Sequence, residues 1–496
     1  MGRRSARLVF VTVSNQFFSN MNQSKRIADK PGLSRRELLK GVAGIGAVAA
    51  FSGCKHVEEN SSNSQASKTP TAGKPALAGK GASKLLAERA DDYLRQIFEV
   101  ARGPGGLIIS HSRFDTRLPL QENDDLPASL HQVLDSAWGK DAPKPTVAEW
   151  YYGENTLWAT GWLLWSQMIR YRVTKDPEAL KVSRKCFCDL NHVFDLCRPI
   201  EPGLLGKPHG GRGGATTSLD QSANPVLLYV EFAREYGTDK EKEIARRNML
   251  DHGDYYLRRN WQVNQHGNLS RVAPPGHPSA MKYFAAVHAA YDMTGEERFR
   301  DATVKLVREL IDKHLLPWPS KRYELNANLF YYAWLGEYWS KTSLAKDFDW
   351  IGNIGVYWEA AQKGLDSEGL LLDGTYDTVN KVFTPVQEGW SERNPPSAGE
   401  KPTQRWWRSP TGYQGRTLYS LTIAILGMLA RKHGLDANAH EISRKILLRI
   451  DRNGLRQCWD DGKLPPEMQP YANLFGAEFP AQWSISYWMG REQGVW

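Results

Sequence analysis

Apolar residues recur at intervals of three and four along most of the chain between residues 83 and 452. This period is typical of helices that bury one face, whereas a half-buried strand alternates every second residue. The sequence shows no long alternation of Val, Ile or Thr of the kind that indicates a sheet. The predicted helices cover residues 83–101, 155–173, 178–196, 224–236, 240–259, 280–293, 296–315, 325–340, 345–363, 416–432 and 437–452. The sequence therefore predicts an all-α domain over residues 85–496.

Two kinds of predicted helix alternate along this domain. One kind is apolar and aromatic on every face, as in the helix that carries Trp158, Trp162 and Trp165. The other kind is amphipathic, as in the helix over 296–315, whose charged residues share one side. Helices that are apolar all round are buried, and one-sided helices lie at the surface. The alternation therefore predicts an inner ring of helices inside an outer ring, with an irregular helical bundle as the alternative.

Short polar turns join each aromatic helix to the amphipathic helix that follows it. In the first turn, Asp176 can cap the second helix and Pro177 can open it. Each turn supplies a residue that ends a helix, a residue that caps the next one, or both. The five turns lie at residues 174–177, 237–239, 294–296, 341–343 and 434–436. Because their spacing is less regular than that of solenoid repeats, the sequence predicts five hairpins in one domain.

The N-terminal segment has the features of an export signal. Arg35 and Arg36 stand directly before a short apolar run over residues 41–50, which is the pattern of a twin-arginine signal. The run is too short to span a bilayer as a stable helix. It is followed by Ser-Gly-Cys54, which resembles a lipobox, although Phe51 replaces the usual Leu. We therefore expect an exported protein, either periplasmic or anchored to the membrane only through lipid on Cys54.

Three regions follow from this pattern. Residues 1–54 form the signal with its lipobox, residues 55–84 form a flexible linker, and residues 85–496 form the catalytic domain. The linker is rich in Ser, Asn, Ala, Gly and Lys and is almost without bulky apolar residues, so it cannot bury a core. The signal holds nine basic and two acidic residues, so it carries +7 of the net charge of +9. The remainder is near neutral, which argues against a nucleic-acid partner.

The cysteine pattern predicts core residues. Cys186 and Cys188 are two apart on a predicted helix, so their side chains point to different faces. Neither a Cys-x-x-Cys nor a His-x-x-x-His spacing accompanies them, and we predict no metal site and no cofactor. A disulfide from Cys186 or Cys188 to Cys197 remains open.

The alternating hairpins, the domain size and the aromatic loops together resemble the (α/α)6 toroid of six-hairpin glycosidases and related polysaccharide lyases. The resemblance covers residues 85–496 and is carried by architecture, not by a diagnostic motif. It implies a sixth hairpin built partly from the two ends of the domain. It also implies that sugar binds where the N-termini of the inner helices and their preceding loops open into a funnel.

A glycine-rich run over residues 210–214 precedes one inner helix. It lacks the Gly-Lys-Ser/Thr ending of a phosphate-binding loop, and we expect a mobile loop that covers a cleft. Asn224-Pro225 is a natural helix start, so Asp220 is expected in the loop just before the helix. Asp220 is then a candidate acid or base, or a brace for loop amides.

Glycoside hydrolysis needs two carboxyl groups at one bond, one protonated and one ionised. The carboxyl candidates, all placed near predicted inner-helix starts or in the long irregular stretch over 364–415, are Glu154, Asp220, Asp373, Asp377 and Glu478. A lyase would instead use a Tyr or His base, and Tyr413 and His277 head those candidates, with Tyr283 and His209 also available. The expected substrate-binding residues are Arg212, Gln221, Lys282, Trp406, Trp407, Arg408 and Arg416.

The basic members of this set favour an acidic sugar, since Arg binds carboxylates through two hydrogen bonds and tryptophan rings stack on sugar faces. We therefore predict a glycoside hydrolase that acts on uronate-containing oligosaccharides. A polysaccharide lyase on uronate polymers is the second possibility, and a non-catalytic glycan-binding lipoprotein is the third. The sequence leaves open the linkage, the stereochemistry and the oligomeric state.

Overall fold

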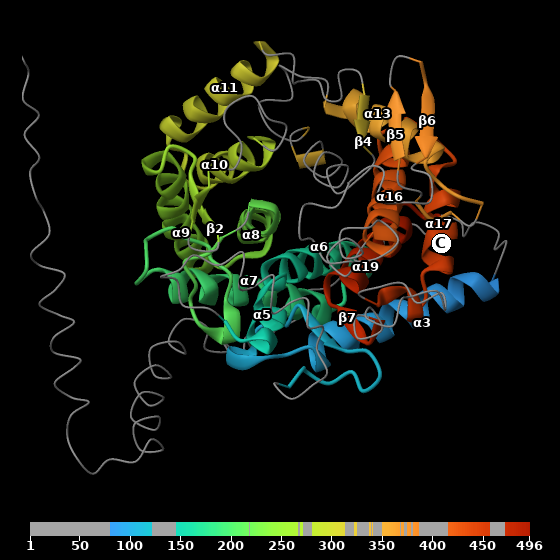
Figure 1. Ribbon diagram of the computed structural model, residues 1–496, viewed down its shortest axis with the longest axis horizontal. Coiled ribbons are helices and arrows are strands. Elements are labelled where there is room, and N and C mark those ends of the chain that lie inside the picture. Colours follow the sequence, from blue (N-terminus) through green and yellow to red (C-terminus); the bar gives the residue numbers. More distant parts are fainter. Residues whose placement is uncertain are drawn as a thin grey trace, which may run out of the picture. The chain divides into compact units, whose positions relative to one another are not determined.

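Helices of two kinds alternate along the chain and form two concentric rings (Figure 1). The computed structural model describes residues 80–121, 145–217, 219–265, 268–270, 280–312, 322–324, 337–338, 340, 350–367, 369–371, 374–377, 380–385, 415–456 and 472–496. All of these belong to one compact unit, Gly73–Trp496. The inner helices are α6 (Thr156–Thr174), α8 (Leu219–Tyr236), α10 (Ala280–Thr294), α16 (Gly415–Lys432) and α19 (Glu478–Glu492). The outer helices are α3 (Lys80–Arg95), α7 (Pro177–Cys197), α9 (Asp239–Arg258), α11 (Glu297–Asp312), α13 (Trp350–Lys363) and α17 (Ala439–Arg449).

The helices of the two rings differ in how much of their surface is buried, as the sequence predicts. In α6 every residue from Thr156 to Ile169 is buried, so this helix is enclosed on all sides. In α7 buried residues recur every three or four positions and the others face solvent. Around the inner ring α16 packs on α19, α19 on α6, α6 on α8, and α8 on α10. The fold is therefore an all-α (α/α)6 toroid, and the irregular bundle is excluded.

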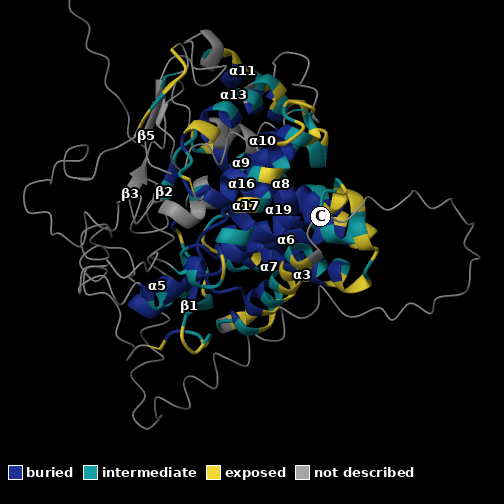
Figure 2. Ribbon diagram, turned by 90° about the vertical axis from the view of Figure 1, so that its right-hand side faces the viewer, coloured by how far each residue is buried: buried dark blue, intermediate teal, exposed yellow. Residues whose placement is uncertain are grey.

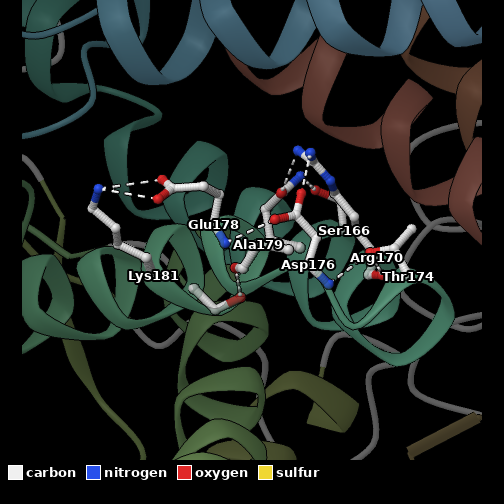
Figure 3. Close-up of polar contacts among 9 residues, drawn as sticks. Ser166, Arg170, Thr174, Asp176, Glu178, Ala179 and Lys181 are labelled. Atoms are coloured by element: carbon white, nitrogen blue, oxygen red, sulfur yellow. Dashed lines mark hydrogen bonds and ion pairs between the residues drawn. The ribbon is translucent and has the colours of Figure 1, made fainter. Parts of the chain in front are cut away.

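The turn between α6 and α7 shows why the chain reverses where the sequence predicts. Lys175 ends α6 in the left-handed conformation, with φ at 56°. Asp176 then caps α7, because its carboxylate accepts a hydrogen bond from the backbone N–H of Glu178 (3.0 Å). Arg170 holds the same carboxylate from α6 at 2.7 Å (Figure 3). The turn is fixed from both helices.

The sixth hairpin joins the two ends of the domain, which confirms the expectation drawn from the resemblance. The last inner helix, α19, packs on the first outer helix, α3. The rings of Tyr93 and Trp483 meet edge to face at 5.0 Å between centroids. Arg89 of α3 also donates to the last carbonyls of α17, at 3.0 Å for Leu447 and 2.7 Å for Leu448. Of the predicted helix over 325–340, the described residues are Glu337, Tyr338 and Ser340.

Short antiparallel strands supplement the helices. β1 (His111–Arg113) pairs with β7 (Leu474–Gly476), and β2 (Val263–Gln265) pairs with β3 (Asn268–Ser270). A third sheet has the order β4-β5-β6, formed by β4 (Arg322–Glu324), β5 (Gly374–Asp377) and β6 (Val382–Pro385). The remaining short helices are α5 (Val147–Gly153), η1 (Gln96–Val100), η2 (Pro104–Gly106), η3 (His209–Gly211) and η5 (Asn453–Leu455). β1, β2 and α5 lie at one end of the helices (Figure 2).

The start of α8 differs from the prediction. The helix begins at Leu219, so Asp220 lies in its first turn and not in the preceding loop. Pro225 is inside the helix, where it packs against the neighbouring inner helix at Gly161. A Cβ at Gly161 would come within 3.0 Å of the Pro225 Cα, so the missing side chain lets the two helices approach. The apparent start signal at Pro225 is therefore a helix-packing contact.

The cysteines that the structure describes are free thiols. Cys186 and Cys197 are buried, as predicted for core residues, and Cys188 is partly buried. Burial raises the pKa of Cys186 to about 12 and that of Cys197 to about 11, so both stay protonated. Within the described residues, none of the helices combines the length and hydrophobicity needed to cross a membrane.

Candidate active site at the N-terminal end of the inner helices

The inner helices run in the same direction, because each is joined to an antiparallel outer partner. Their N-termini therefore meet at one end of the toroid. Three predicted binding or catalytic residues besides Asp220 lie in the first turns there, namely Gln221 in α8, Lys282 in α10 and Arg416 in α16. Two predicted carboxyl groups, Glu154 and Glu478, flank the starts of α6 and α19.

Glu154 is positioned by the short helix α5. Thr146 and Glu149 form a capping box at its start, in which each side chain accepts a hydrogen bond from the other residue's backbone N–H. Glu154 follows the last helical residue, and its N–H donates to the carbonyl of Trp150 (2.9 Å). The chain then enters α6 through Asn155. The pattern Thr-x-x-Glu before an apolar stretch is a sequence signal for this helix.

Glu478 opens α19 and is completely buried. Asn155 donates from Nδ2 to Oε1 of Glu478 at 3.0 Å. Burial penalises the ionised carboxylate and raises the pKa of Glu478 to about 7, although the bonds from Asn155 and from its own backbone N–H oppose this. Glu478 is therefore a carboxylic acid that keeps its proton close to neutral pH.

Ser110 connects the two helix starts. Its hydroxyl accepts a hydrogen bond from the backbone N–H of Asn155 (2.5 Å). Its own N–H donates to the carbonyl of Tyr152 (3.0 Å), and its carbonyl accepts from the N–H of Ala477 (2.8 Å). The segment beside β1 thus joins the end of α5 to the start of α19.

Glu154 forms an ion pair with Lys207, a lysine that the sequence analysis did not select. The side chain of Lys207 is 2% exposed and that of Glu154 is 13% exposed. An opposite charge at contact distance favours the ionised form of a carboxylate. Glu154 and Glu478 therefore differ in environment, since one faces an ammonium group and the other is enclosed with an amide.

The glycine-rich run is packed closely against its own chain. A Cβ on Gly206 would lie 1.9 Å from the carbonyl oxygen of Gly214, and one on Gly213 would lie 2.1 Å from that of Leu196. Lys207 bonds to Thr216 across the same segment, backbone N–H to carbonyl, at 2.8 Å. The glycines here allow backbone to approach backbone, in contrast to the expected mobile cover over a cleft.

Two histidines lie beside α5. His209 is buried against Gly153, where a Cβ would meet the ring nitrogen Nδ1 at 2.8 Å. His111 is fully buried, stacks edge to face on Tyr151 at 5.2 Å, and lies with Nδ1 3.4 Å from the Tyr151 carbonyl. His209, which was predicted as a lyase base, therefore lies beside Gly153, the residue that precedes Glu154.

Two other predicted residues have partners that suit a structural role. Arg212 is 66% exposed and pairs with Glu149 of the capping box at 2.8 Å. Asp377 on β5 accepts hydrogen bonds from Asn380, from the backbone N–H at 3.0 Å and from Nδ2 at 2.9 Å. Asp377 thus braces the turn into β6.

The remaining predicted site residues lie outside the described part of the chain. They are Asp373, His277, Tyr413, Trp406, Trp407 and Arg408. Among the residues that are described, no group of three or more His, Cys, Asp or Glu is arranged to hold a metal ion.

Sequence reasoning missed Lys207 and Asn155. Both act through contacts between distant segments, since Lys207 reaches Glu154 from the loop after α7 and Asn155 reaches Glu478 near the C-terminus. The only local signal for Lys207 is a charged residue close after the apolar Leu204 and Leu205, from which Gly206 separates it. Position before an inner helix was enough to select Glu154 and Glu478, but not to find their partners.

No protein-family model matches the sequence, and no curated protein matches it. Solved structures do. A sugar epimerase from a ruminal bacterium superposes with a TM-score of 0.50 at 11% identity, over 83% of this chain and 99% of that one. Cellobiose 2-epimerase from Bacillus thermoamylovorans gives 0.48 at 12% identity, covering 82% and 98%. An endoglucanase from the termite Nasutitermes takasagoensis gives 0.45 at 10% identity, covering 84% and 100%. The chain thus has the (α/α)6 fold of six-hairpin glycosidase-like enzymes.

Proposed function

We propose that this chain is an exported carbohydrate-active enzyme, a glycoside hydrolase that cleaves uronate-containing oligosaccharides with paired carboxyl groups. The observation that carries the proposal is the contrast between Glu478 and Glu154. One is a buried carboxylic acid with a raised pKa, and the other is a carboxylate paired with Lys207. Carboxyl groups whose environments favour opposite protonation states mark acid and base partners.

In this proposal Glu478 donates its proton to the glycosidic oxygen as the bond to the anomeric carbon breaks. Glu154 is the second carboxylate, which either removes a proton from the attacking water or attacks the anomeric carbon itself. Asp220 is the alternative second carboxylate, since it lies in the first turn of α8, at the same end of the toroid as the start of the neighbouring helix α6. The anomeric configuration of the first product, followed by NMR, distinguishes direct attack of water from a covalent intermediate.

The uronate assignment is supported by cations at this end. Lys282 and Arg416 lie in the first turns of two inner helices. Basic groups at helix N-termini add to the partial positive charge of the helix dipole, which favours an anionic ligand.

A sugar epimerase is the second candidate. One solved structure with this fold carries that description, and His209 lies against Gly153 beside Glu154. An epimerase removes and returns a proton at a ring carbon, for which a histidine base suits neutral pH. A polysaccharide lyase and a non-catalytic glycan-binding lipoprotein are the third and fourth candidates.

Mass spectrometry of products from matched neutral and acidic oligosaccharides tests these functions. We expect cleavage with addition of one water, and faster turnover of the acidic member of each pair. An unchanged mass with a new sugar configuration indicates an epimerase, an unsaturated ultraviolet-absorbing product a lyase, and binding without product a binding protein.

Variants test the residues. We expect Glu478→Gln and Glu154→Gln each to lower turnover by roughly 10²–10⁴-fold, the usual contribution of a positioned proton transfer. If Asp220 is the second carboxylate instead, we expect Asp220→Asn to lower turnover by this amount and Glu154→Gln to lower it less. The matched control is Glu178→Gln, which removes a charge from an exposed ion pair on the outer helix α7 and should leave turnover close to normal. Normal turnover in all three test variants would remove the two-carboxylate mechanism.

A further inference from the structure

The glycine-rich segment holds a lysine, Lys207, almost completely out of solvent and in contact with a candidate catalytic carboxylate. Burying a charged lysine costs free energy unless an opposite charge pairs with it. Glu154 supplies that opposite charge for Lys207.

The backbone around Lys207 is held on both sides. Its N–H donates to the Thr216 carbonyl, and its carbonyl oxygen would lie 2.4 Å from a Cβ on Gly214. A Cβ on Gly206, directly before it, would lie still closer to the Gly214 carbonyl oxygen, at 1.9 Å. Larger residues at Gly206 or Gly214 would push the two chain segments apart. The glycines therefore fix where the Lys207 side chain starts.

We infer that Lys207 is a positioning residue, whose ammonium group keeps Glu154 ionised and fixed in place for its part in the reaction. The inference rests on the proposed function, because it gives Glu154 a catalytic role. The glycine-rich run then has a structural role, because its close backbone packing places the Lys207 ammonium group at the end of α5.

Among the residues that the structure describes, the neighbouring charged groups have contacts of their own. On the loop around η3, His209 lies against Gly153, and Arg212 is committed to Glu149. On β1, His111 contacts Tyr151, and Arg113 pairs with Asp115 at 2.9 Å. At the start of α19, Glu478 is held through Asn155, the residue that follows Glu154.

The test is Lys207→Met, which keeps the length of the side chain and removes its charge. We expect the acid limb of the pH–rate profile to move up by roughly 1–3 pH units, the size of effect that a contacting opposite charge has on a carboxyl group. The matched control is Lys181→Met, which breaks an exposed lysine–glutamate pair on α7 and should leave the limb unchanged. A variant that loses stability while its acid limb stays in place would overturn the inference.

A second measurement works without any substrate. Infrared difference spectra between Lys207→Met and Lys207→Met/Glu154→Gln, recorded from pH 4 to pH 7, give the pH at which Glu154 takes up its proton. We expect this pH to lie roughly 1–3 units higher than in the matching pair with native Lys207. If the two pairs titrate at the same pH, Lys207 does not set the charge of Glu154. If they differ while no sugar is turned over, the proposed function fails and the control of Glu154 by Lys207 stands. The double variant removes both charges, so it leaves no unpaired charge at this position.

Discussion

Burial of a carboxyl group at the start of an inner helix makes its ionised form costly, and Glu478 is such a group. Its pKa is raised from 4.5 in the unfolded chain to about 7 in the fold. Between these two values the unfolded chain loses its proton while the fold retains it. The free energy of unfolding therefore falls as pH rises through this window, and above pH 7 the cost is present in full.

Glu478→Gln should remove that cost, because glutamine is uncharged and can still accept the bond from Asn155. Above pH 7 we expect the variant to be more stable than the native protein by about 3 kcal/mol, and below pH 4.5 to match it. Urea unfolding at pH 4.5, 6 and 8 measures the difference. Equal stability at pH 8 would show that the fold does not hold Glu478 protonated. Together with the expected loss of turnover, a gain in stability separates a functional carboxyl group from a structural brace.

Individual site residues could be predicted only where local position was sufficient. Glu154 and Glu478 precede or open inner helices, and the pattern of helices reveals this. Asp220 was assigned to a loop, because Pro225 gives the same signal when it starts a helix as when it packs inside one. Lys207 owes its role to a contact across 53 residues of sequence, which no local pattern records.

Helices and strands also differ in how far the local sequence predicts them. Helix positions followed from the apolar period and the capping residues. For α7 the cap at Asp176 and the opening Pro177 were predicted from the turn, although the predicted helix range began one residue later, at 178. Strands of three or four residues are too short to show a recognisable alternation of apolar and polar residues. The sequence analysis therefore missed the three small sheets that the structure describes. The sixth hairpin, formed by α19 and α3, came from the resemblance and not from any turn, because its two helices stand at opposite ends of the domain.

This closing hairpin predicts a sensitive position on α3. Arg89 donates to two carbonyls at the end of α17, which have no partner within that helix. Arg89→Met keeps much of the apolar stem but leaves both carbonyls without the charged donor, so we expect a loss of about 1–3 kcal/mol in the free energy of unfolding.

The midpoint of urea unfolding, with its slope unchanged, measures this loss. Lys84→Met is the control on the same helix, since Lys84 is 79% exposed and makes only a loose pair with Glu88 at 3.8 Å. An Arg89→Met protein as stable as the control would mean that the hydrogen bonds of Arg89 do not stabilise the packing of α3 on α17.

At the scale of the whole molecule, charge and fold distinguish the predicted export signal from the helical toroid. Residues 1–54 carry +7 of the net charge of +9, and the helical toroid follows from α3 onward. The described cysteines are free thiols, two of them buried and one partly buried. For the N-terminal segment, the sequence predicts export by the twin-arginine route from Arg35 and Arg36.

Replacing both Arg35 and Arg36 with Lys should therefore retain the protein in the cytoplasm of a bacterium that has this route, because the signal depends on the arginine pair and not on charge alone. Cell fractionation with immunodetection measures the distribution. Lys25→Arg with Arg26→Lys, which changes a basic pair outside the motif, is the matched control and should not alter export.

Cys54 extends the same prediction to the membrane. If the signal is removed before Cys54 and the new N-terminus is lipidated, the native protein sediments with membranes, while Cys54→Ala is exported but found in the soluble fraction. The predicted linker over 55–84 is shorter than expected at its C-terminal end, because α3 begins at Lys80. About 25 residues then separate the lipid from the toroid, on the order of 30 Å as a root-mean-square distance if they form the flexible chain that the sequence predicts. Export that survives the double Lys change would rule out the twin-arginine signal. A native protein that never sediments with membranes would rule out the lipid anchor and leave a free periplasmic enzyme.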